Sequence, residues 1–192
     1  MFLFMTIDTE NIESRDERLD SYLSAVANGD NDAFAKLYEE TYSAVFGFAL
    51  SILKHHHDAE DAAQNTFVVL HTSAAAYEAK GKPMAYIFTV TRNICLMKLR
   101  EAKKTAATSV EDYEHLAFED DHSLSTEDKL VLQTVLSVLS DDDLQIVMLH
   151  ALAGMKFREI AHLLDLTIST VLSKYHRSMT KLRKHLIEEG NQ

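Results

Sequence analysis

Two short segments of this 192-residue chain concentrate basic side chains that could neutralise phosphate groups. Residues 92–104 contain five Lys or Arg and one acid, and residues 174–184 contain five and no acid. Clustered bases of this kind are typical of nucleic-acid contacts. For residues 92–104 a structural explanation also exists, because bases near the C-terminus of a helix oppose its dipole favourably. Nucleic-acid binding is nevertheless the first hypothesis for both segments.

Residues 157–183 have the pattern of two helices that meet at a tight corner. Asp165 occupies the corner, where Asp tolerates a positive φ better than most residues, and Thr167 is placed to cap the second helix. Such a corner fits a helix-turn-helix, whose second helix enters the major groove of DNA. The apolar positions of that helix are Val171, Tyr175, Met179 or Ser178, Leu182 and Leu186. Its outer face keeps Ser169, Thr170, Ser173, Lys174, Arg177 and Lys181.

The net charge of −11 at first argues against nucleic-acid binding. Its distribution removes the objection, because residues 1–27 carry −4 and residues 105–128 carry −8. The rest of the chain sums to +1. The excess acid therefore lies in a tail and a linker rather than in the candidate binding segments.

The composition predicts an all-α protein with two small helical domains. With one Pro and five Gly, the chain has few residues for the tight turns that join β-strands, whereas good helix formers are frequent. We expect a flexible tail over residues 1–18, a first domain over 19–104, a flexible acidic linker over 105–125 and a second domain over 126–188.

Local signals mark the helices of the first domain. Asn28 and Gly29 form a helix stop, and Asp30 looks like the N-cap of a long central helix that runs to Leu53. Asp58 can cap the next helix, and Pro83 suits the first turn of a fourth helix, where a missing N–H costs nothing.

Several functional classes are disfavoured. Cys95 is the single cysteine, so no intrachain disulfide can form, which suits a cytoplasmic location. His55, His56 and His57 are expected on a solvated loop, because adjacent residues rarely converge on one metal ion. No catalytic constellation is recognisable, so we expect no enzyme, no metal, no cofactor and no small-molecule substrate. The apolar residues 1–7 lack a basic leader, and no later run approaches a membrane span.

Taken together, the segments resemble a known family. The chain carries, in this order, GDNDAFAKLYEETYSAVF, DAEDAAQNTF, YIFTVTRNICLMKLR, an acidic linker and LSDDDLQIVMLHALAGMKFREIAHLLDLTISTVLSKYHRSMTKLRKHL. This order resembles the extracytoplasmic-function group of sigma-70 family factors over nearly everything after Val26. The resemblance implies sigma-2 and sigma-4 domains in a promoter-specificity subunit that binds core RNA polymerase and promoter DNA. An anti-sigma factor is a further candidate partner.

The resemblance also implies three groups of site residues. The residues expected to dock on the polymerase clamp helices are Asp61, Gln64 and Phe67. Those expected at the minus-10 element are Tyr77, Lys80, Lys82, Tyr86, Arg92, Asn93, Lys98 and Arg100, with residues 77–82 placed where the family captures an unstacked base. Those expected at the minus-35 element are Thr167, Ser169, Thr170, Ser173, Lys174, Arg177 and Lys181.

Three positions depart from the family pattern. Tyr86 stands where the family usually has Trp, which exchanges one stacking aromatic ring for another. Asp165 replaces the usual corner Gly. Met97 stands where the family commonly has Asp, four residues after Asn93, so the minus-10 segment is expected to read a different sequence or to bind less strictly.

The acidic linker and two rival functions complete the sequence-based hypotheses. The acids of residues 111–128 are expected to mimic nucleic acid and, away from the polymerase, to cover the basic faces of the two domains. One rival is a helix-turn-helix regulator that acts without polymerase. The other is a sigma-like adaptor that lacks promoter recognition.

Overall fold

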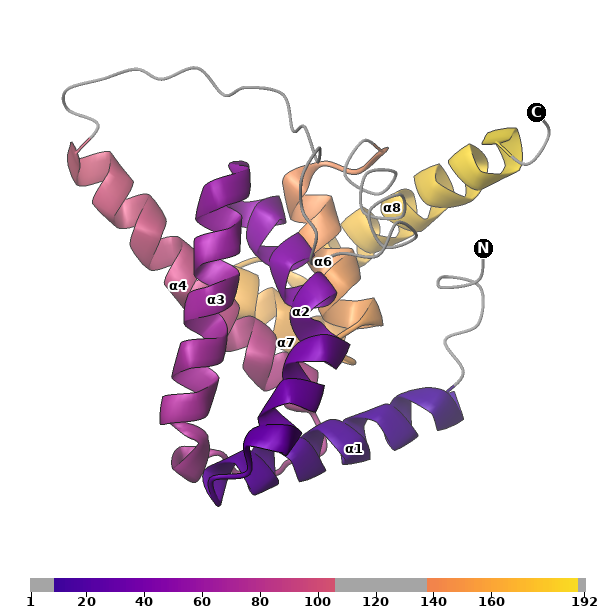
Figure 1. Ribbon diagram of the computed structural model, residues 1–192. Helices are drawn as coiled ribbons and strands as arrows, with labels where there is room; N and C mark the ends of the chain where they lie inside the picture. Colours follow the sequence, from indigo (N-terminus) through magenta and orange to yellow (C-terminus); the bar gives the residue numbers. More distant parts are fainter. Residues whose placement is uncertain (1–8, 106–137, 190–192) are drawn as a thin grey trace.

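The computed structural model describes residues 9–105 and 138–189, and every regular element within these ranges is helical (Figure 1). The all-α prediction is therefore confirmed. No helix among the described residues has the length and apolar character needed to span a membrane. The elements are α1 (Thr9–Ala27), α2 (Asn31–Leu53), α3 (His56–Thr72), the 3-10 helix η1 (Ala74–Ala76), α4 (Pro83–Thr105), α6 (Asp141–Ala151), α7 (Phe157–Leu164) and α8 (Ile168–Glu189).

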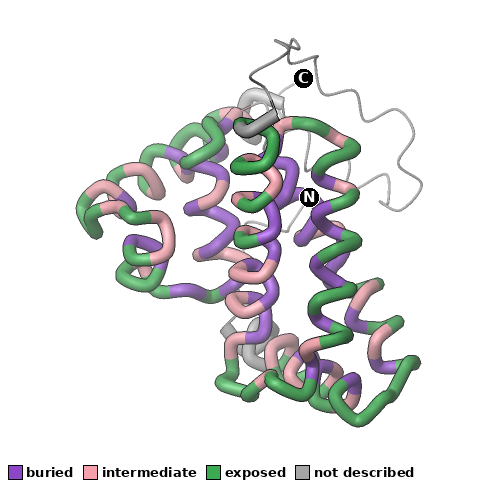
Figure 2. Tube along the Cα trace, turned by 90° about the vertical axis from the view of Figure 1, so that its left-hand side faces the viewer, coloured by how far each residue is buried: buried purple, intermediate pink, exposed green. Residues whose placement is uncertain are grey.

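Helix α2 lies at the centre of the molecule. It packs against α1, α3, α4 and α6 (Figure 1). Its segment 45–51 is buried on every side, because different helices cover its different faces. Phe48 of this segment stacks on Phe88 of α4, with ring centroids 4.6 Å apart. Figure 2 shows the buried positions gathered along the inward sides of the helices. The central helix predicted from the apolar periodicity is thus confirmed.

Local capping signals were mostly confirmed, with one error. Asp30 caps α2, its carboxylate accepting from the backbone N–H of Asp32 at 2.9 Å and of Ala33 at 3.0 Å. Helix α4 begins at Pro83, as predicted. Helix α3, however, begins at His56, and its N-cap is the imidazole of His55 rather than Asp58. The predicted loop is therefore right for His55, which lies between the helices, and wrong for His56 and His57, because the His55 ring accepts the free N–H of Asp58, 3.4 Å away, and starts the helix earlier.

Helix α1 starts earlier than the sequence pattern predicted. Residues 1–18 were assigned to a flexible tail, whereas α1 begins at Thr9. The apolar stripe that predicts this helix begins only at Leu19, so its first half carries no amphipathic signal. The side chain of Arg15 donates a hydrogen bond to the carbonyl of Leu152, at the end of α6. A contact distant in sequence thus ties this half of α1 to the rest of the fold.

The described chain forms a first unit, residues 9–105, and a second unit, residues 138–189, which pack against each other. Buried side chains of both units belong to one continuous apolar core. Two ion pairs join the units, Lys54 with Asp141 and Lys82 with Glu159. The acidic segment between the units, residues 126–137 of the predicted second domain and the apolar N-terminal residues 1–7 lie outside the described residues.

Replacing Asp30 by Ala should lower the free energy of unfolding by about 1 kcal/mol, because two N–H groups at the start of α2 lose their acceptor. Denaturant unfolding followed by circular dichroism would measure the change. Asp30→Asn is the matched control, since Asn caps helices as well as Asp does. Equal losses in the two variants would contradict the capping role.

Candidate nucleic-acid interface

The helix-turn-helix corner is built as the sequence predicted. Asp165 ends α7 in the left-handed conformation, with φ 56° and ψ 45°. The next N–H, that of Leu166, donates to the carbonyl of Ala161 at 2.9 Å. The hydroxyl of Thr167 then accepts from the backbone N–H of Thr170 at 3.2 Å and caps α8. These contacts fix the angle at which α8 leaves α7.

Helix α8 turns one face to the core and another to solvent. Val171, Ser178 and Leu182 are buried, and Met179 packs half-buried against the same core, so both of the residues that the sequence offered as alternatives face inward. The Ser178 hydroxyl donates to the carbonyl of Lys174 at 2.8 Å, so its burial leaves no unsatisfied donor. The solvent face contains Ser169, Ser173 and Arg177, spaced one turn apart.

The same solvent face contains residues that sequence reasoning missed. His176 and Thr180 are exposed, and with 3.6 residues per turn they project close to Ser173 and Ser169. The sequence could have indicated these two residues through their helical spacing from Ser169 and Ser173, but not through their charge. A groove-facing surface on α8 would therefore mix hydroxyl, imidazole and guanidinium groups.

The predicted lysines of α8 lie at its border with α6. Lys174 places its ammonium 3.1 Å from Asp142 and 3.5 Å from Asp143. Asp143 is only 6% exposed, and its second oxygen lies 4.0 Å from the ammonium of Lys181. Both lysines are thus partly neutralised by α6. Arg177 has no acidic partner among the described residues, and it is the predicted base best placed to meet DNA.

Helix α4 presents a stripe of side chains at three-to-four-residue spacing. The stripe consists of Tyr86, Val90, Asn93, Met97 and Arg100. Met97 is 52% exposed, so the position that commonly holds Asp in the family offers an apolar contact here.

Two predicted bases of α4 lie off this stripe. Arg92 is half-buried, and burial lowers the pKa of its guanidinium. Lys98 projects toward α3, 3.2 Å from Asp61 and 3.4 Å from Asp58. Burial alone would lower the pKa of Lys98, but the two carboxylates outweigh it and the pKa is raised. The structure therefore does not bring Lys98 together with the stripe.

The loop over residues 77–82 joins η1 to α4 and sits at the start of the stripe. The ring of Tyr77 lies 4.9 Å from that of Tyr86, tilted by 46°. Lys80 pairs with Glu78 at 2.8 Å on the surface. Lys82 pairs with both carboxylate oxygens of Glu159 in α7, each at 2.8 Å. Both predicted lysines of the loop thus already hold an acid.

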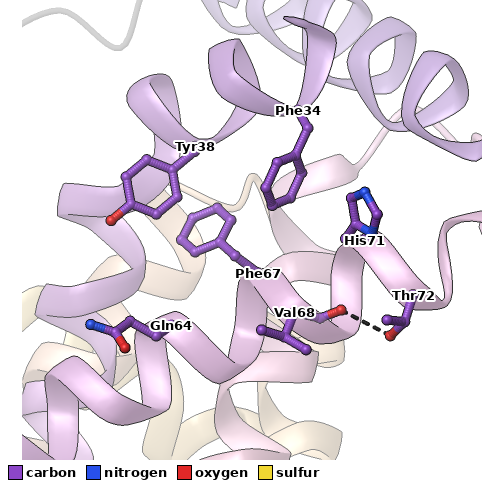
Figure 3. A pocket seen from close by; sticks show the side chains of 7 residues that line it. All are labelled: Phe34, Tyr38, Gln64, Phe67, Val68, His71 and Thr72. Atoms are coloured by element: carbon purple, nitrogen blue, oxygen red, sulfur yellow. Dashed lines mark hydrogen bonds between the residues drawn. The ribbon is translucent and has the colours of Figure 1, made fainter. Parts of the chain in front are cut away.

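An apolar groove lies between α2 and α3 (Figure 3). Its volume is about 320 Å³, and it is lined by Phe34, Tyr38, Gln64, Phe67, Val68, His71 and Thr72. Two of the three predicted docking residues line it: Gln64 is exposed, and Phe67 is buried between the rings of Phe34 and Tyr38. Val68, 58% exposed, was missed because it carries no charge and stands in no motif that would single it out. The third, Asp61, is exposed on the same helix.

Other reactive side chains have structural surroundings. Cys95 is buried, and burial raises the pKa of its thiol to about 12, as suits a core residue. His56, His57 and Glu60 bring their potential ligand atoms within 4.8 Å of one another at the start of α3. Glu60, one turn along the helix, was not considered beside the histidines in the sequence. It already lies 3.9 Å from the His57 ring as an ion-pair partner.

Family models match both units. The model described as Sigma-70 region 2 matches residues 37–105, and the model described as Sigma-70, region 4 matches residues 129–182. Together they cover more than half of the chain. The first match spans the groove apart from Phe34, the loop and the α4 stripe, and the second spans the corner and most of α8.

Curated relatives match over most of their length. The chain is 24% identical over 180 residues to the ECF RNA polymerase sigma factor SigK of Mycobacterium ulcerans (strain Agy99), covering 90% of this chain and 95% of the relative. It is 23% identical over 176 residues to the ECF RNA polymerase sigma factor SigW of Bacillus subtilis (strain 168), covering 85% and 94%.

Two solved structures share the fold. CnrH in complex with the cytosolic domain of CnrY superposes with a TM-score of 0.53 at 21% identity, over 89% of this chain and 98% of that chain. The sigma factor RpoE in complex with the anti-sigma factor NepR from Bartonella quintana gives 0.52 at 23% identity, over 80% and 96%.

The pairing of Lys82 with Glu159 should be visible in a pH titration. The ammonium of Lys82 lowers the pKa of Glu159, and the N–H of Lys156 lowers it further, so the Glu159 midpoint should lie below its ordinary 4.5. Because the pKa of Glu159 is lowered in the folded protein, the ion pair contributes its full stability at pH values above the ordinary carboxyl pKa. This contribution is lost as the pH falls through the lowered pKa of the folded state. NMR titration of the carboxyl carbon would measure it.

The Lys82→Met variant should raise the Glu159 midpoint toward 4.5. Glu78 is the internal control, because its own pKa is lowered by Lys80 and should not move. A Glu159 midpoint that Lys82→Met leaves unchanged would show that the ion pair does not form in solution.

Proposed function

This chain belongs to the extracytoplasmic-function group of the sigma-70 family of RNA polymerase sigma factors, and from that premise we propose how its surfaces divide the work. As a sigma factor it binds core RNA polymerase and directs promoter-specific initiation, and it is not itself an enzyme. We assign polymerase docking and the minus-10 element to residues 19–104, and the minus-35 element to residues 126–188. Its site of action would be the cytoplasm, with an anti-sigma protein as a further partner.

The polymerase would dock on the α3 face that carries the groove. The groove offers an apolar surface, with Phe67 in its wall and Val68 beside it. Exposed Asp61 lies on the same helix, near the end that Lys98 also reaches. A partner helix with apolar side chains flanked by bases would match both features, because buried apolar area supplies affinity and charge complementarity supplies orientation.

The minus-10 element would be opened and held by the loop and the α4 stripe. Tyr77 and Tyr86 supply aromatic rings on which an unstacked base can stack, and Arg100 supplies a charge for the backbone. Met97 replaces a carboxylate that could accept a hydrogen bond from a base, and it favours apolar contacts such as a thymine methyl group. The preferred minus-10 sequence should therefore differ from that of relatives with Asp at this position.

The minus-35 element would be read by the solvent face of α8. Arg177, Ser173 and Ser169 would enter the major groove, with His176 beside them. Arg is the side chain best suited to bidentate contact with guanine, whereas Ser can bond to several bases. Lys174 and Lys181 are better placed for phosphates, and they must first leave the acids of α6.

The region 2 match is the observation that carries this proposal over its rivals. It covers the docking helix and the minus-10 segment, which a helix-turn-helix regulator acting without polymerase would not need. The adaptor alternative rests on Met97 and on the acidic net charge of the chain. An adaptor would bind polymerase but support no promoter-dependent initiation, whereas a regulator would fail to bind polymerase.

Val68→Asp should weaken co-elution with core RNA polymerase by about tenfold or more, because it places a charge at the apolar groove where the partner helix would bury it. Size-exclusion chromatography over a range of concentrations would measure the affinity. Ser21→Asp on the exposed side of α1 is the control for an added negative charge. Undiminished binding by Val68→Asp would rule out this groove as the docking site.

Arg177→Ala should weaken promoter binding by the holoenzyme by about 1–3 kcal/mol if the guanidinium contacts a base bidentately. Lys174→Ala should cost less, since this lysine is already paired with Asp142. Competition with duplexes that contain or lack the minus-35 element would isolate the effect, and Lys36→Ala on α2 controls for lost positive charge. A smaller loss for Arg177→Ala than for Lys174→Ala would reverse the assignment.

A further inference from the structure

A single carboxylate of α1 holds both ends of the loop over residues 77–82. The hydroxyl of Tyr77 donates to Oδ1 of Asp20. The backbone N–H of Gly81 donates to Oδ2 of the same carboxylate at 3.1 Å. The partners lie 57 and 61 residues away from Asp20 in the sequence. One side chain therefore fixes the positions of a ring and of a backbone segment four residues apart.

Asp20 is itself held in a fixed position. Its neighbour Leu19 and Leu23, one turn along α1, are both fully buried. Helix α1 packs against α2, and also against η1 and α4, the two elements on either side of the loop. The carboxylate is half-buried, where hydrogen bonds to a charged acceptor are stronger than in open water.

The loop has little else to give it a defined shape. The Lys80–Glu78 pair is fully exposed, and ion pairs of that kind contribute little to order. Gly81 has a φ of +69°, a conformation that glycine adopts at low steric cost but does not enforce. The loop's other contacts lie at its two ends: the Tyr77 N–H donates to the carbonyl of Ala74 at 2.9 Å, the Tyr77 ring packs beside Tyr86, and Lys82 pairs with Glu159. The bonds to Asp20 are the contacts that hold the Tyr77 hydroxyl and the Gly81 N–H together.

We propose that Asp20 is a positioning residue for base capture at the minus-10 element, an inference that rests on the function proposed for the loop. By holding the Tyr77 hydroxyl, Asp20 sets the position and tilt of the ring relative to Tyr86. By holding the Gly81 N–H, it sets the point from which the chain enters α4. An unstacked base then meets a surface that is already formed and does not have to order the loop on binding.

The first experiment measures the loop in the free full-length chain. In Asp20→Ala, hydrogen exchange at the Gly81 amide should accelerate by about tenfold or more, since the amide loses its charged acceptor. Tyr77→Phe removes the other bond and should leave the Gly81 amide closer to wild type. Ser24→Ala, one turn along α1, is the control. An unchanged rate of hydrogen exchange at the Gly81 amide in Asp20→Ala would show that Asp20 does not hold the loop.

The second experiment measures base capture by the holoenzyme. Promoter DNA that carries the fluorescent base 2-aminopurine in the minus-10 element reports the unstacking of that base. Binding to a duplex that contains only the minus-35 element reports the contact made by α8. Asp20→Ala should lower the apparent affinity for the unstacked minus-10 strand about tenfold or more, because both charge-assisted hydrogen bonds that position the loop are lost. Polymerase binding and minus-35 affinity should stay unchanged, which a general folding defect would not allow.

The outcomes separate the two levels of the proposal. A normal 2-aminopurine signal in Asp20→Ala, with the loop loosened, would overturn the positioning role alone. If wild-type holoenzyme gives no unstacking signal near Tyr77, and Tyr77→Ala, which removes the ring, behaves like wild type in the capture assay, the capture function of the loop itself fails. Partial restoration by Asp20→Glu, which keeps the charged acceptor, would support positioning through the carboxylate.

Discussion

The burial of α2 on all sides is the constraint on which the rest of the structure depends. Segment 45–51 cannot be left bare, because its apolar side chains face several directions at once. Helices α1, α3 and α4 cover part of it, and α6 covers the remainder. The groove, the loop, the α4 stripe and the helix-turn-helix are thus all placed with respect to one helix.

Internal ion pairing explains how an acidic chain can carry DNA-binding surfaces. Three of the lysines in or near the proposed contacts, Lys82, Lys98 and Lys174, already hold acids of the same chain. Each must exchange a carboxylate for a phosphate when DNA binds, so the free factor gains less from DNA than its count of bases suggests. Under the proposed assignment, we expect the exchange to become favourable when polymerase brings the second DNA contact close. Arg177, without such a partner among the described residues, needs no exchange.

Local chemistry made part of this structure predictable, and long-range geometry made the rest unpredictable. The cap at Asp30 and the corner at Asp165 depend on residues within a few positions of each other, so the sequence reveals them. The bonds from Asp20 to the loop and from Lys82 to Glu159 join residues 57 to 77 positions apart. No periodicity reports such pairs. For the same reason, the charge of Lys98 predicted a DNA contact but not where its side chain lies, because its pairing with Asp61 arises only when α3 and α4 pack together.

The shared core of the two units limits how far the chain can be treated as modular. A helix-turn-helix unit transplanted from a relative would arrive with its own α6 surface, which has to fit the face of α2 that α6 covers. A mismatch would open voids in the interior rather than merely alter a surface. Chimeric factors built on this scaffold would therefore need the matching residues of α2 as well, so promoter preference and core packing can be exchanged only together.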